Sequence, residues 1–265
     1  MRLLATDLDG TLLGPGGTLS DRNVDALHAA RAAGWYVVLA SGRPPFMVSE
    51  FLPRLAAAVT HGVLANGSLV CTLPDQATLR AIRFGVSMAT DVVTRLRALD
   101  GAYGFAMATD AGFAHERGFA ERMPAPQPVP ATADVLTAAE GANEALKLMV
   151  FHQVHNAHRL LDVLPPLLGD DLSVTHMGAD CVEVGPTGVD KGTGLAWLCA
   201  HLDVNASDVV SFGDEFNDHE MLLWSGRGIA MGNAHPLTRE LADEVTLTNA
   251  EDGVAVAIER MLADA

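Results

Sequence analysis

The most informative segment of this sequence is Leu3-Leu4-Ala5-Thr6-Asp7-Leu8-Asp9-Gly10-Thr11-Leu12. Its apolar start predicts a buried strand over residues 2–6. The strand leads into Asp7 and Asp9, and side chains two positions apart on an extended segment share a face, so these carboxylates can converge on one point. Close carboxylates repel each other unless a cation or a shared proton holds them. The pattern therefore indicates a metal-assisted reaction in which one carboxylate attacks and the other moves protons.

Two other interpretations of this stretch have to be weighed. The sequence Asp-Leu-Asp-Gly also fits an ordinary polar turn. A calcium loop of the EF-hand type is excluded, because Leu12 stands where glycine is required and Thr18 where the bidentate glutamate belongs. The choice between a turn and a reactive site therefore depends on the residues downstream.

Size and composition are those of an ordinary soluble globular protein. The chain has 265 residues, enough for one large domain or two modest ones, with 49% hydrophobic and 19% charged residues. No apolar run reaches the roughly 18 residues of a membrane span, and Asp7 and Asp9 would interrupt the apolar region of a signal peptide. Because Cys71, Cys181 and Cys199 are odd in number and scattered, we expect a reduced cytoplasm, with neither a zinc site nor a disulfide framework.

The net charge restricts the partners. A formal charge of -16 argues against nucleic acid and anionic membrane surfaces. It also disfavours anionic small substrates unless the site carries its own cations, and it favours a soluble monomer or a small homo-oligomer. Of the 17 basic residues, only Lys147 and Lys191 are lysines. A lysine kept against this bias favours a role for a compact ammonium rather than a planar guanidinium.

The two ends of the sequence share one pattern, in which apolar strands alternate with helices. In the first part we expect a helix that is capped by Ser20 and ends at Gly34, and strands over residues 35–40 and 59–65. In the last part we expect strands over 209–212, 229–231 and 245–247, and helices over 191–202, 236–242 and 253–262, with a further helix ending at Trp224. This alternation predicts an α/β fold with a doubly wound, mostly parallel, Rossmann-like sheet.

The middle of the chain has a different pattern of expected helices and strands. It combines helical stretches with short segments in which apolar and polar residues alternate, and it contains a proline-rich loop, Pro124–Pro130. The alternating segments and the helices together suggest an antiparallel sheet with helices on one face. The expected segments are 103–108, 146–151, 172–177 and 181–184, and the expected helices are 88–99 and 157–167. We therefore expect an α+β cap domain, residues 85–186, inserted into a core of residues 1–84 and 187–265. Connections near 84–87 and 185–189 would form paired hinges that permit opening and closing over a site.

Two further motifs suit an anion. Ser41-Gly42 follows the second strand, where a hydroxyl and the N–H groups of a helix start form an anion site, although Ser41 also fits a simple helix cap. Lys191 opens a helix, where the helix dipole disfavours a cation. Such a lysine needs a compensating anion, either a phosphoryl group or Asp7, and the alternative is a solvated surface lysine.

Acidic residues follow a later strand. In Gly213-Asp214-Glu215-Phe216-Asn217-Asp218 the acids come directly after the strand expected at 209–212, which places them at the same edge of the sheet as Asp7. The alternative is a solvated acidic loop.

For two further polar residues, a purely structural role and a role in a site both remain open. Asn66, in Asn66-Gly67, fits a hairpin turn better than a catalytic role. Lys147 shares a strand face with Met149 and Phe151, and either points into a pocket or lies on a solvated strand edge.

The motifs Asp-Leu-Asp-Gly-Thr-Leu, Ser-Gly-Arg, Asp-Lys-Gly and Gly-Asp-x-x-Asn-Asp, in this order, resemble the haloacid dehalogenase-like superfamily. Within it the chain resembles the Cof-type hydrolases, whose cap is inserted between the second and third motifs. The short gap from Asp7 to Ser41 has no room for an insert, whereas the gap from Ser41 to Lys191 holds one. The resemblance extends to Gly232-Asn233-Ala234, Thr248-Asn249 and Asp252-Gly253-Val254, and departs from the usual aliphatic residue at His219.

The resemblance implies a role for each motif. Asp7 would be the nucleophile that attacks phosphorus and forms an aspartyl-phosphate. Asp9 would protonate the leaving oxygen and then deprotonate the water that releases phosphate. The residues that would hold the phosphoryl oxygens are Ser41, Gly42, Lys191 and Asn217.

The resemblance also implies Mg²⁺, which prefers oxygen ligands. Its ligands would be the Asp7 carboxylate, the Asp9 main-chain carbonyl and Asp214. Asp218 would be a further ligand or, as we favour, an anchor for a metal-bound water.

These expectations describe a Mg²⁺-dependent phosphatase of small phosphorylated metabolites. A dehalogenase would not need Asp9, and a mutase of the superfamily would place its cap between the first two motifs. The remaining alternative is a non-catalytic metabolite-binding protein that retains the fold, which would not need both Asp7 and Asp9. Sugar phosphates, a phosphorylated flavin precursor and pyridoxal phosphate remain open as substrates.

Overall fold

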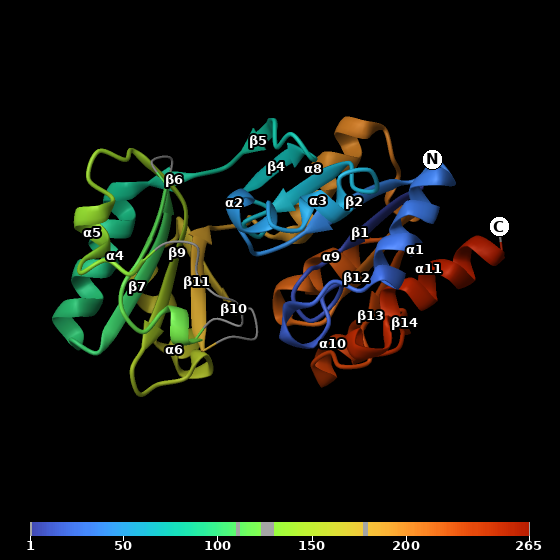
Figure 1. Cartoon of the computed structure of the whole chain (residues 1–265). Helices are drawn as coiled ribbons and strands as arrows, with labels where there is room; N and C mark the ends of the chain where they lie inside the picture. Colours follow the sequence, from blue (N-terminus) through green and yellow to red (C-terminus); the bar gives the residue numbers. More distant parts are fainter. Residues whose placement is uncertain (1, 110–111, 123–129, 177–179, 265) are drawn as a thin grey trace. The chain divides into compact units, whose positions relative to one another are not determined.

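The computed structural model describes residues 2–109, 112–122, 130–176 and 180–264. The chain divides into two compact units, Met1–Ala81 with Asp190–Ala265, and Ile82–Val189 (Figure 1). These bounds lie within three residues of the division expected at 85 and 186. At the expected connections, Phe84–Gly85 forms β6 and β11 extends over Cys181–Pro186, while the hinge motion expected there stays a prediction.

The first unit is built on a sheet whose strands run in the order β14-β13-β12-β1-β2-β3-β4-β5. The parallel strands are β1 (Leu3–Thr6), β2 (Tyr36–Ala40), β3 (His61–Leu64), β12 (Val209–Gly213), β13 (Arg227–Ala230) and β14 (Glu244–Val245). Strands β4 (Leu69–Thr72) and β5 (Thr78–Ala81) are antiparallel at one edge. The chain builds outward in one direction from β1 and in the other from β12, so the strand order reverses between these two strands. In open α/β sheets, such a reversal is where the binding crevice forms.

Helices cover both faces of this sheet. On one face lie α1 (Asp21–Ala32) and α11 (Gly253–Ala263), and on the other α8 (Lys191–Leu202) and α9 (His219–Trp224) (Figure 1). Leu195 and Leu198 of α8 pack with Ala5 of β1 in one buried cluster. The shorter helices are α2 (Pro45–Val48), α3 (Leu52–Leu55) and α10 (Pro236–Leu241), with 3-10 turns η1 (Pro15–Gly17), η3 (Ala206–Asp208), η4 (Phe216–Asp218) and η5 (Asn249–Glu251). The predicted doubly wound α/β core is confirmed.

Local capping signals fix where the long helices begin. The Ser20 hydroxyl accepts a hydrogen bond from the Asn23 N–H at 3.0 Å and starts α1, as predicted. At α8, the Asp190 side chain accepts from the Thr193 N–H at 2.7 Å, and the Thr193 hydroxyl accepts from the Asp190 N–H at 3.0 Å. This reciprocal capping box makes Lys191 the first helical residue.

The second unit is an antiparallel sheet in the order β10-β11-β9-β7-β8, with β6 paired to β9. Its other strands are β7 (Tyr103–Thr109), β8 (Gly112–His115), β9 (Glu144–His152) and β10 (Leu172–His176). Its helices are α4 (Val86–Leu99), α5 (Val135–Ala138), α6 (Ala157–Val163) and α7 (Pro165–Leu168), with the 3-10 turn η2 (Ala120–Arg122). The helix expected over 157–167 is therefore two helices, because Pro165 cannot continue α6.

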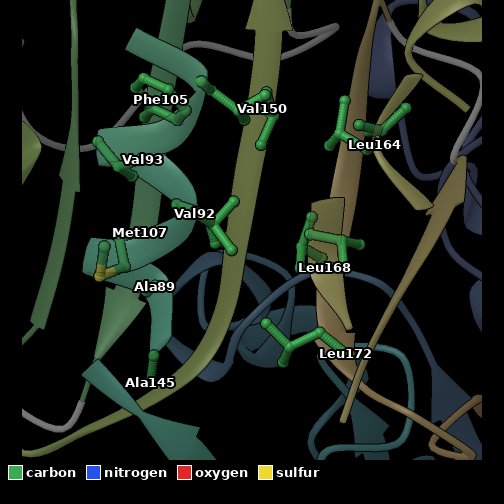
Figure 2. Packing of buried hydrophobic residues seen from close by; sticks show 14 of the residues in the cluster. Ala89, Val92, Val93, Phe105, Met107, Ala145, Val150, Leu164, Leu168 and Leu172 are labelled. Atoms are coloured by element: carbon green, nitrogen blue, oxygen red, sulfur yellow. The ribbon is translucent and has the colours of Figure 1, made fainter. Parts of the chain in front are cut away.

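The larger of two apolar clusters in this unit lies on the face of the sheet that α4 covers (Figure 2). Val92 and Val93 of α4 pack with Phe105 of β7 and Val150 of β9, all at most 3% exposed. Apart from Pro130, the proline-rich loop expected at 124–130 lies outside the described residues, as does Met177. Across the described parts of the chain, no helix is both long and apolar enough to span a membrane.

Candidate active site

The site forms where β1 and β12 end side by side. The two strands are parallel, with Thr6 opposite Phe212, and the Asp7 N–H donates to the Phe212 carbonyl at 3.0 Å. Asp7 therefore directly follows β1 and Asp214 directly follows β12, and both are buried. Two carboxylates from distant parts of the chain thus meet at the sheet edge where chemistry is expected.

Lys191 joins these acids. Its Nζ donates to Asp7 Oδ1 at 2.7 Å and to Asp218 Oδ1 at 2.6 Å, and the side chain is only 1% exposed. Burial alone would lower the pKa of Lys191, but the charges of Asp218 and Asp7 outweigh it and raise the pKa above its ordinary value. The interpretation of Lys191 as a solvated surface residue is therefore wrong. Its compensating anions in this structure are the two carboxylates.

Asp218 is fully buried and held on both of its oxygens. Oδ1 accepts from Lys191, while Oδ2 accepts from the backbone N–H groups of Asp214 at 2.9 Å and Glu215 at 3.0 Å. A Cβ on Gly213 would stand 2.5 Å from the Asp218 Cβ, so only glycine permits this packing. Asp218 thereby fixes the turn that presents Asp214, and the solvated acidic loop is also wrong.

Asp7, Asp214 and Asp218 form a cluster that suits a divalent cation. One oxygen of each lies within 4.8 Å of the others. Burial, followed by the charges of the neighbouring acids, raises the pKa of Asp7 to about 7 and that of Asp214 to about 9, against the lowering effect of Lys191. If all three acids were ionised, the single Lys191 ammonium would not balance their charge, and the raised pKa values reflect how strongly this form is disfavoured without a further cation. Hard oxygen donors with excess negative charge match what Mg²⁺ requires.

The loop after β1 is shaped around Asp214. The Thr11 hydroxyl donates to Asp214 Oδ1 at 2.8 Å. Gly10 adopts a φ of +82°, and a Cβ there would stand 2.1 Å from Asp214 Oδ2. The glycine after Asp9 therefore makes room for the Asp214 carboxylate.

Three asparagine side chains donate hydrogen bonds to main-chain carbonyls of the same loop. Asn233 Nδ2 donates to the Gly10 carbonyl at 2.8 Å, and Asn233 Oδ1 accepts from the Asn249 N–H at 2.8 Å. Asn249 Nδ2 donates to the Leu13 carbonyl at 2.8 Å, and Asn23 Nδ2 to the Leu12 carbonyl at 3.0 Å. Only the family resemblance drew attention to Asn233 and Asn249, and Asn23 carried no signal in the sequence.

Asp9 is held by a different partner. Its carboxylate accepts two hydrogen bonds from Arg43, from Nε to Oδ2 at 2.8 Å and from NH2 to Oδ1 at 2.8 Å. Asp7 and Asp9 follow the same strand, yet Asp7 pairs with Lys191 and Asp9 with Arg43. Sequence reasoning missed Arg43, although it stands in the Ser-Gly-Arg motif.

The predicted phosphate-binding residues lie on loops tied to one another. Ser41 is buried; its hydroxyl accepts from the Arg43 N–H at 3.1 Å, and its carbonyl accepts from the Asn66 N–H at 3.1 Å. Gly42 lies between Ser41 and Arg43, and Asn217 Nδ2 donates to Asn66 Oδ1 at 3.2 Å. Asn66, expected only to make a turn, therefore also links the loop of Ser41 to that of Asn217.

Lys147 lies on β9 of the second unit. Strand β9 lies between β11 and β7, and the Lys147 ammonium pairs with the Glu183 carboxylate, both being buried. The expectation of a solvated strand edge is therefore wrong for Lys147.

Comparison with known proteins shows what the chain resembles. A sequence model of the haloacid dehalogenase-like hydrolases matches residues 4–258. The pyridoxal phosphate phosphatase YbhA of Escherichia coli is 30% identical over 270 residues, which cover 96% of each chain. The 5-amino-6-(5-phospho-D-ribitylamino)uracil phosphatase YcsE of Bacillus subtilis is 28% identical over 97% of this chain and 94% of its own.

A solved structure shares the architecture. The crystal structure of a haloacid dehalogenase-like hydrolase from Bacteroides thetaiotaomicron superimposes with a TM-score of 0.81. The superposition covers 98% of this chain and 99% of that one, at 26% identity.

Proposed function

This chain belongs to the haloacid dehalogenase-like hydrolases and is a phosphoric monoester hydrolase, and we propose that it depends on Mg²⁺ and works through an aspartyl-phosphate on Asp7. The proposal is supported by the convergence of four side chains at the carboxyl ends of β1 and β12, those of Asp7, Lys191, Asp214 and Asp218.

Asp7 and Asp9 divide the chemistry in this proposal. A carboxylate oxygen of Asp7 attacks phosphorus in line, and the P–O bond to the leaving group breaks as Asp9 protonates the leaving oxygen. Asp9 then accepts a proton from water, which attacks phosphorus, releases inorganic phosphate and restores the Asp7 carboxylate. Because phosphoryl transfer needs mainly alignment and charge neutralisation, this set of residues suffices.

The other residues of the site would bind the metal ion or the phosphoryl group. Asp7, the Asp9 main-chain carbonyl and Asp214 would hold Mg²⁺, with Asp218 anchoring a metal-bound water, a role supported by the three hydrogen bonds that its carboxylate accepts. When bound, Mg²⁺ neutralises charge on the phosphoryl group and favours the ionised form of these carboxylates. Ser41, Gly42, Lys191 and Asn217 would hold the phosphoryl oxygens.

The substrates are small phosphorylated metabolites. Relatives are named as phosphatases of pyridoxal phosphate, of HMP-PP and of a phosphorylated ribitylaminouracil. We propose a phosphomonoester of this size, a sugar phosphate included, turned over in the cytoplasm by a monomer or small homo-oligomer. The role of the inserted unit as a cap that selects the substrate stays a prediction.

The test is the hydrolysis of p-nitrophenyl phosphate with and without Mg²⁺. We expect metal-dependent activity in the wild type and a loss of at least about a thousandfold in Asp7→Asn. The matched control is Asp25→Asn, which changes an exposed aspartate on α1. Full activity in Asp7→Asn would refute the mechanism, and an inactive wild type would favour the non-catalytic binding protein. A panel of phosphorylated metabolites compared by kcat/KM would then identify the substrate.

A further inference from the structure

Arg43 makes the most specific contact with Asp9. Its Nε and NH2 groups donate to the two oxygens of one carboxylate, each at 2.8 Å. This is the two-pronged geometry in which a guanidinium recognises a carboxylate, and it fixes the plane of the carboxylate as well as its distance. A lysine ammonium in the same place could supply the charge but not the two parallel hydrogen bonds.

The Arg43 guanidinium is fixed by contacts other than Asp9. Its NH1 donates to Glu50 Oε1 at 2.8 Å and to the Met47 carbonyl at 3.4 Å. Its carbon Cζ lies 5.1 Å from the ring centre of Phe51, within the range of a cation–π contact. The Arg43 side chain is only 5% exposed, whereas that of Asp9 is 24% exposed. The better-held partner is therefore Arg43, and Asp9 takes its orientation from it.

The Arg43 backbone is tied to the same site. Its N–H donates to the Ser41 hydroxyl at 3.1 Å, and its carbonyl accepts from the Ala65 N–H at 3.1 Å. Ala65 and Asn66 adopt φ values of 50° and 52°, in the left-handed region that non-glycine residues rarely use. Arg43 therefore connects the loop of Ser41, the turn after β3 and the Asp9 side chain.

We infer that Arg43 is the positioning residue for Asp9, holding its carboxylate where it can serve the leaving oxygen. The inference rests on the proposed function, in which Asp9 transfers the proton. A group that transfers a proton has to stay within hydrogen-bond reach of the reacting oxygen, and misplacement by about 1 Å can cost about a hundredfold in rate. Asp7 does not depend on Arg43, because Lys191 holds it.

The test is a double-mutant cycle between Arg43→Lys and Asp9→Asn on phenyl phosphate and p-nitrophenyl phosphate. We expect Arg43→Lys to lower kcat on phenyl phosphate by at least about tenfold with KM within about twofold. The loss should be smaller on p-nitrophenyl phosphate, whose better leaving group needs less protonation. In the Asp9→Asn background, Arg43→Lys should change kcat by less than about twofold, because Arg43 then has no proton-transferring carboxylate to position.

The control is Arg54→Lys, which makes the same change at a half-exposed arginine paired with Asp21. It should leave kcat within about twofold of the wild type for both substrates. Equal losses from Arg43→Lys with and without Asp9, a kcat within twofold of the wild type, or a raised KM alone would overturn the inference. If Asp9→Asn itself keeps full activity, the proposed function fails and the inference fails with it, so the two failures are distinguishable.

A second measurement does not depend on the folding of an Arg43 variant. In the ¹⁵N NMR spectrum, the wild type should show an Arg43 Nε–H signal shifted by its bond to the carboxylate and slow to exchange with water. Asp9→Asn should move that signal and speed its exchange. An Arg43 Nε–H signal that is identical in the wild type and in Asp9→Asn would overturn the inference.

Discussion

The Nζ atom of Lys191 lies 2.7 Å from an Asp7 carboxylate oxygen, although the two residues are 184 positions apart in the sequence. Two features bring these residues together. Strand β12, which follows α8, pairs with β1. The capping box of Asp190 and Thr193 starts α8 at Lys191. The nucleophile proposed here therefore depends on the sheet topology and on one helix cap.

Replacing Gly10 with alanine should weaken Mg²⁺ binding. The new Cβ would stand 2.1 Å from Asp214 Oδ2 and displace that carboxylate. We expect the Mg²⁺ dissociation constant, measured by calorimetric titration, to rise at least about tenfold, or about 1.4 kcal/mol. Gly16→Ala is the matched control, because Gly16 has a similar φ of +72° but nothing within 4 Å of its Cβ position. Equal effects of the two variants would show that backbone strain, and not the Asp214 contact, is responsible.

Asn233→Ala should destabilise the loop after β1. The change removes the hydrogen bonds to the Gly10 carbonyl and from the Asn249 N–H, each of 2.8 Å. Hydrogen bonds of this kind contribute about 1 kcal/mol each, so we expect a loss of about 1–2 kcal/mol in the free energy of unfolding, measured with urea. Asn205→Ala, at an exposed asparagine whose side chain caps no helix, should change it by less than about 0.5 kcal/mol. Indistinguishable stabilities of the two variants would contradict the role of Asn233.

Glu244→Gln should lower stability at neutral pH but not in acid. Burial would raise the pKa of Glu244, but hydrogen bonds from Arg260 and Arg227 outweigh it and lower the pKa below its ordinary value. Because the pKa is lower in the folded state, the pairs stabilise the fold above the ordinary glutamate pKa, and this contribution is lost as the pH falls through the lowered pKa. All three side chains are partly exposed, so we expect a deficit of at most about 1 kcal/mol at pH about 7.

Urea unfolding at neutral and acidic pH measures this deficit. Glu140→Gln, on an exposed side chain, serves as the control. A Glu244→Gln deficit that grows as the pH falls would show that the sign of this linkage is wrong.

Asp9→Asn should separate turnover from metal binding. The proposed ligand at this position is the main-chain carbonyl, which the substitution keeps, whereas proton transfer needs the carboxylate. We expect kcat to fall by at least about a hundredfold and the Mg²⁺ dissociation constant to stay within about threefold of the wild type. A large loss of Mg²⁺ affinity in a titration of this variant would contradict the assignment.

The core of the fold was predictable because its signals are local. Apolar runs ended by acids at Asp7 and by the Gly213–Asp218 loop identify parallel strands, and Ser20 identifies a helix start. The strands Thr78–Ala81 and Gly112–His115 were not predicted, because their side chains are largely partly buried and their patterns are weak.

The site residues that directly follow a strand could be predicted from the sequence. The hydrogen-bond pairs between side chains of different loops could not. Asp7 and Asp214 follow paired strands, so their proximity follows from the topology. Neither the pairing of Asp9 with Arg43 nor the bond between Asn66 and Asn217 follows from topology. Both depend on side-chain orientation, which for Arg43 is fixed by neighbours such as Phe51, and one sequence carries no record of that orientation.

In the proposed mechanism, Asp7 carries the phosphoryl group during turnover. The most direct measurement is to quench the enzyme with acid during hydrolysis of p-nitrophenyl phosphate in Mg²⁺, reduce the acyl phosphate with borohydride and map the product by mass spectrometry. Reduction of an aspartyl-phosphate gives homoserine, which we expect at position 7 of the wild type and not in the substrate-free enzyme. Turnover without homoserine at position 7, or with the modification at another aspartate, would contradict the account.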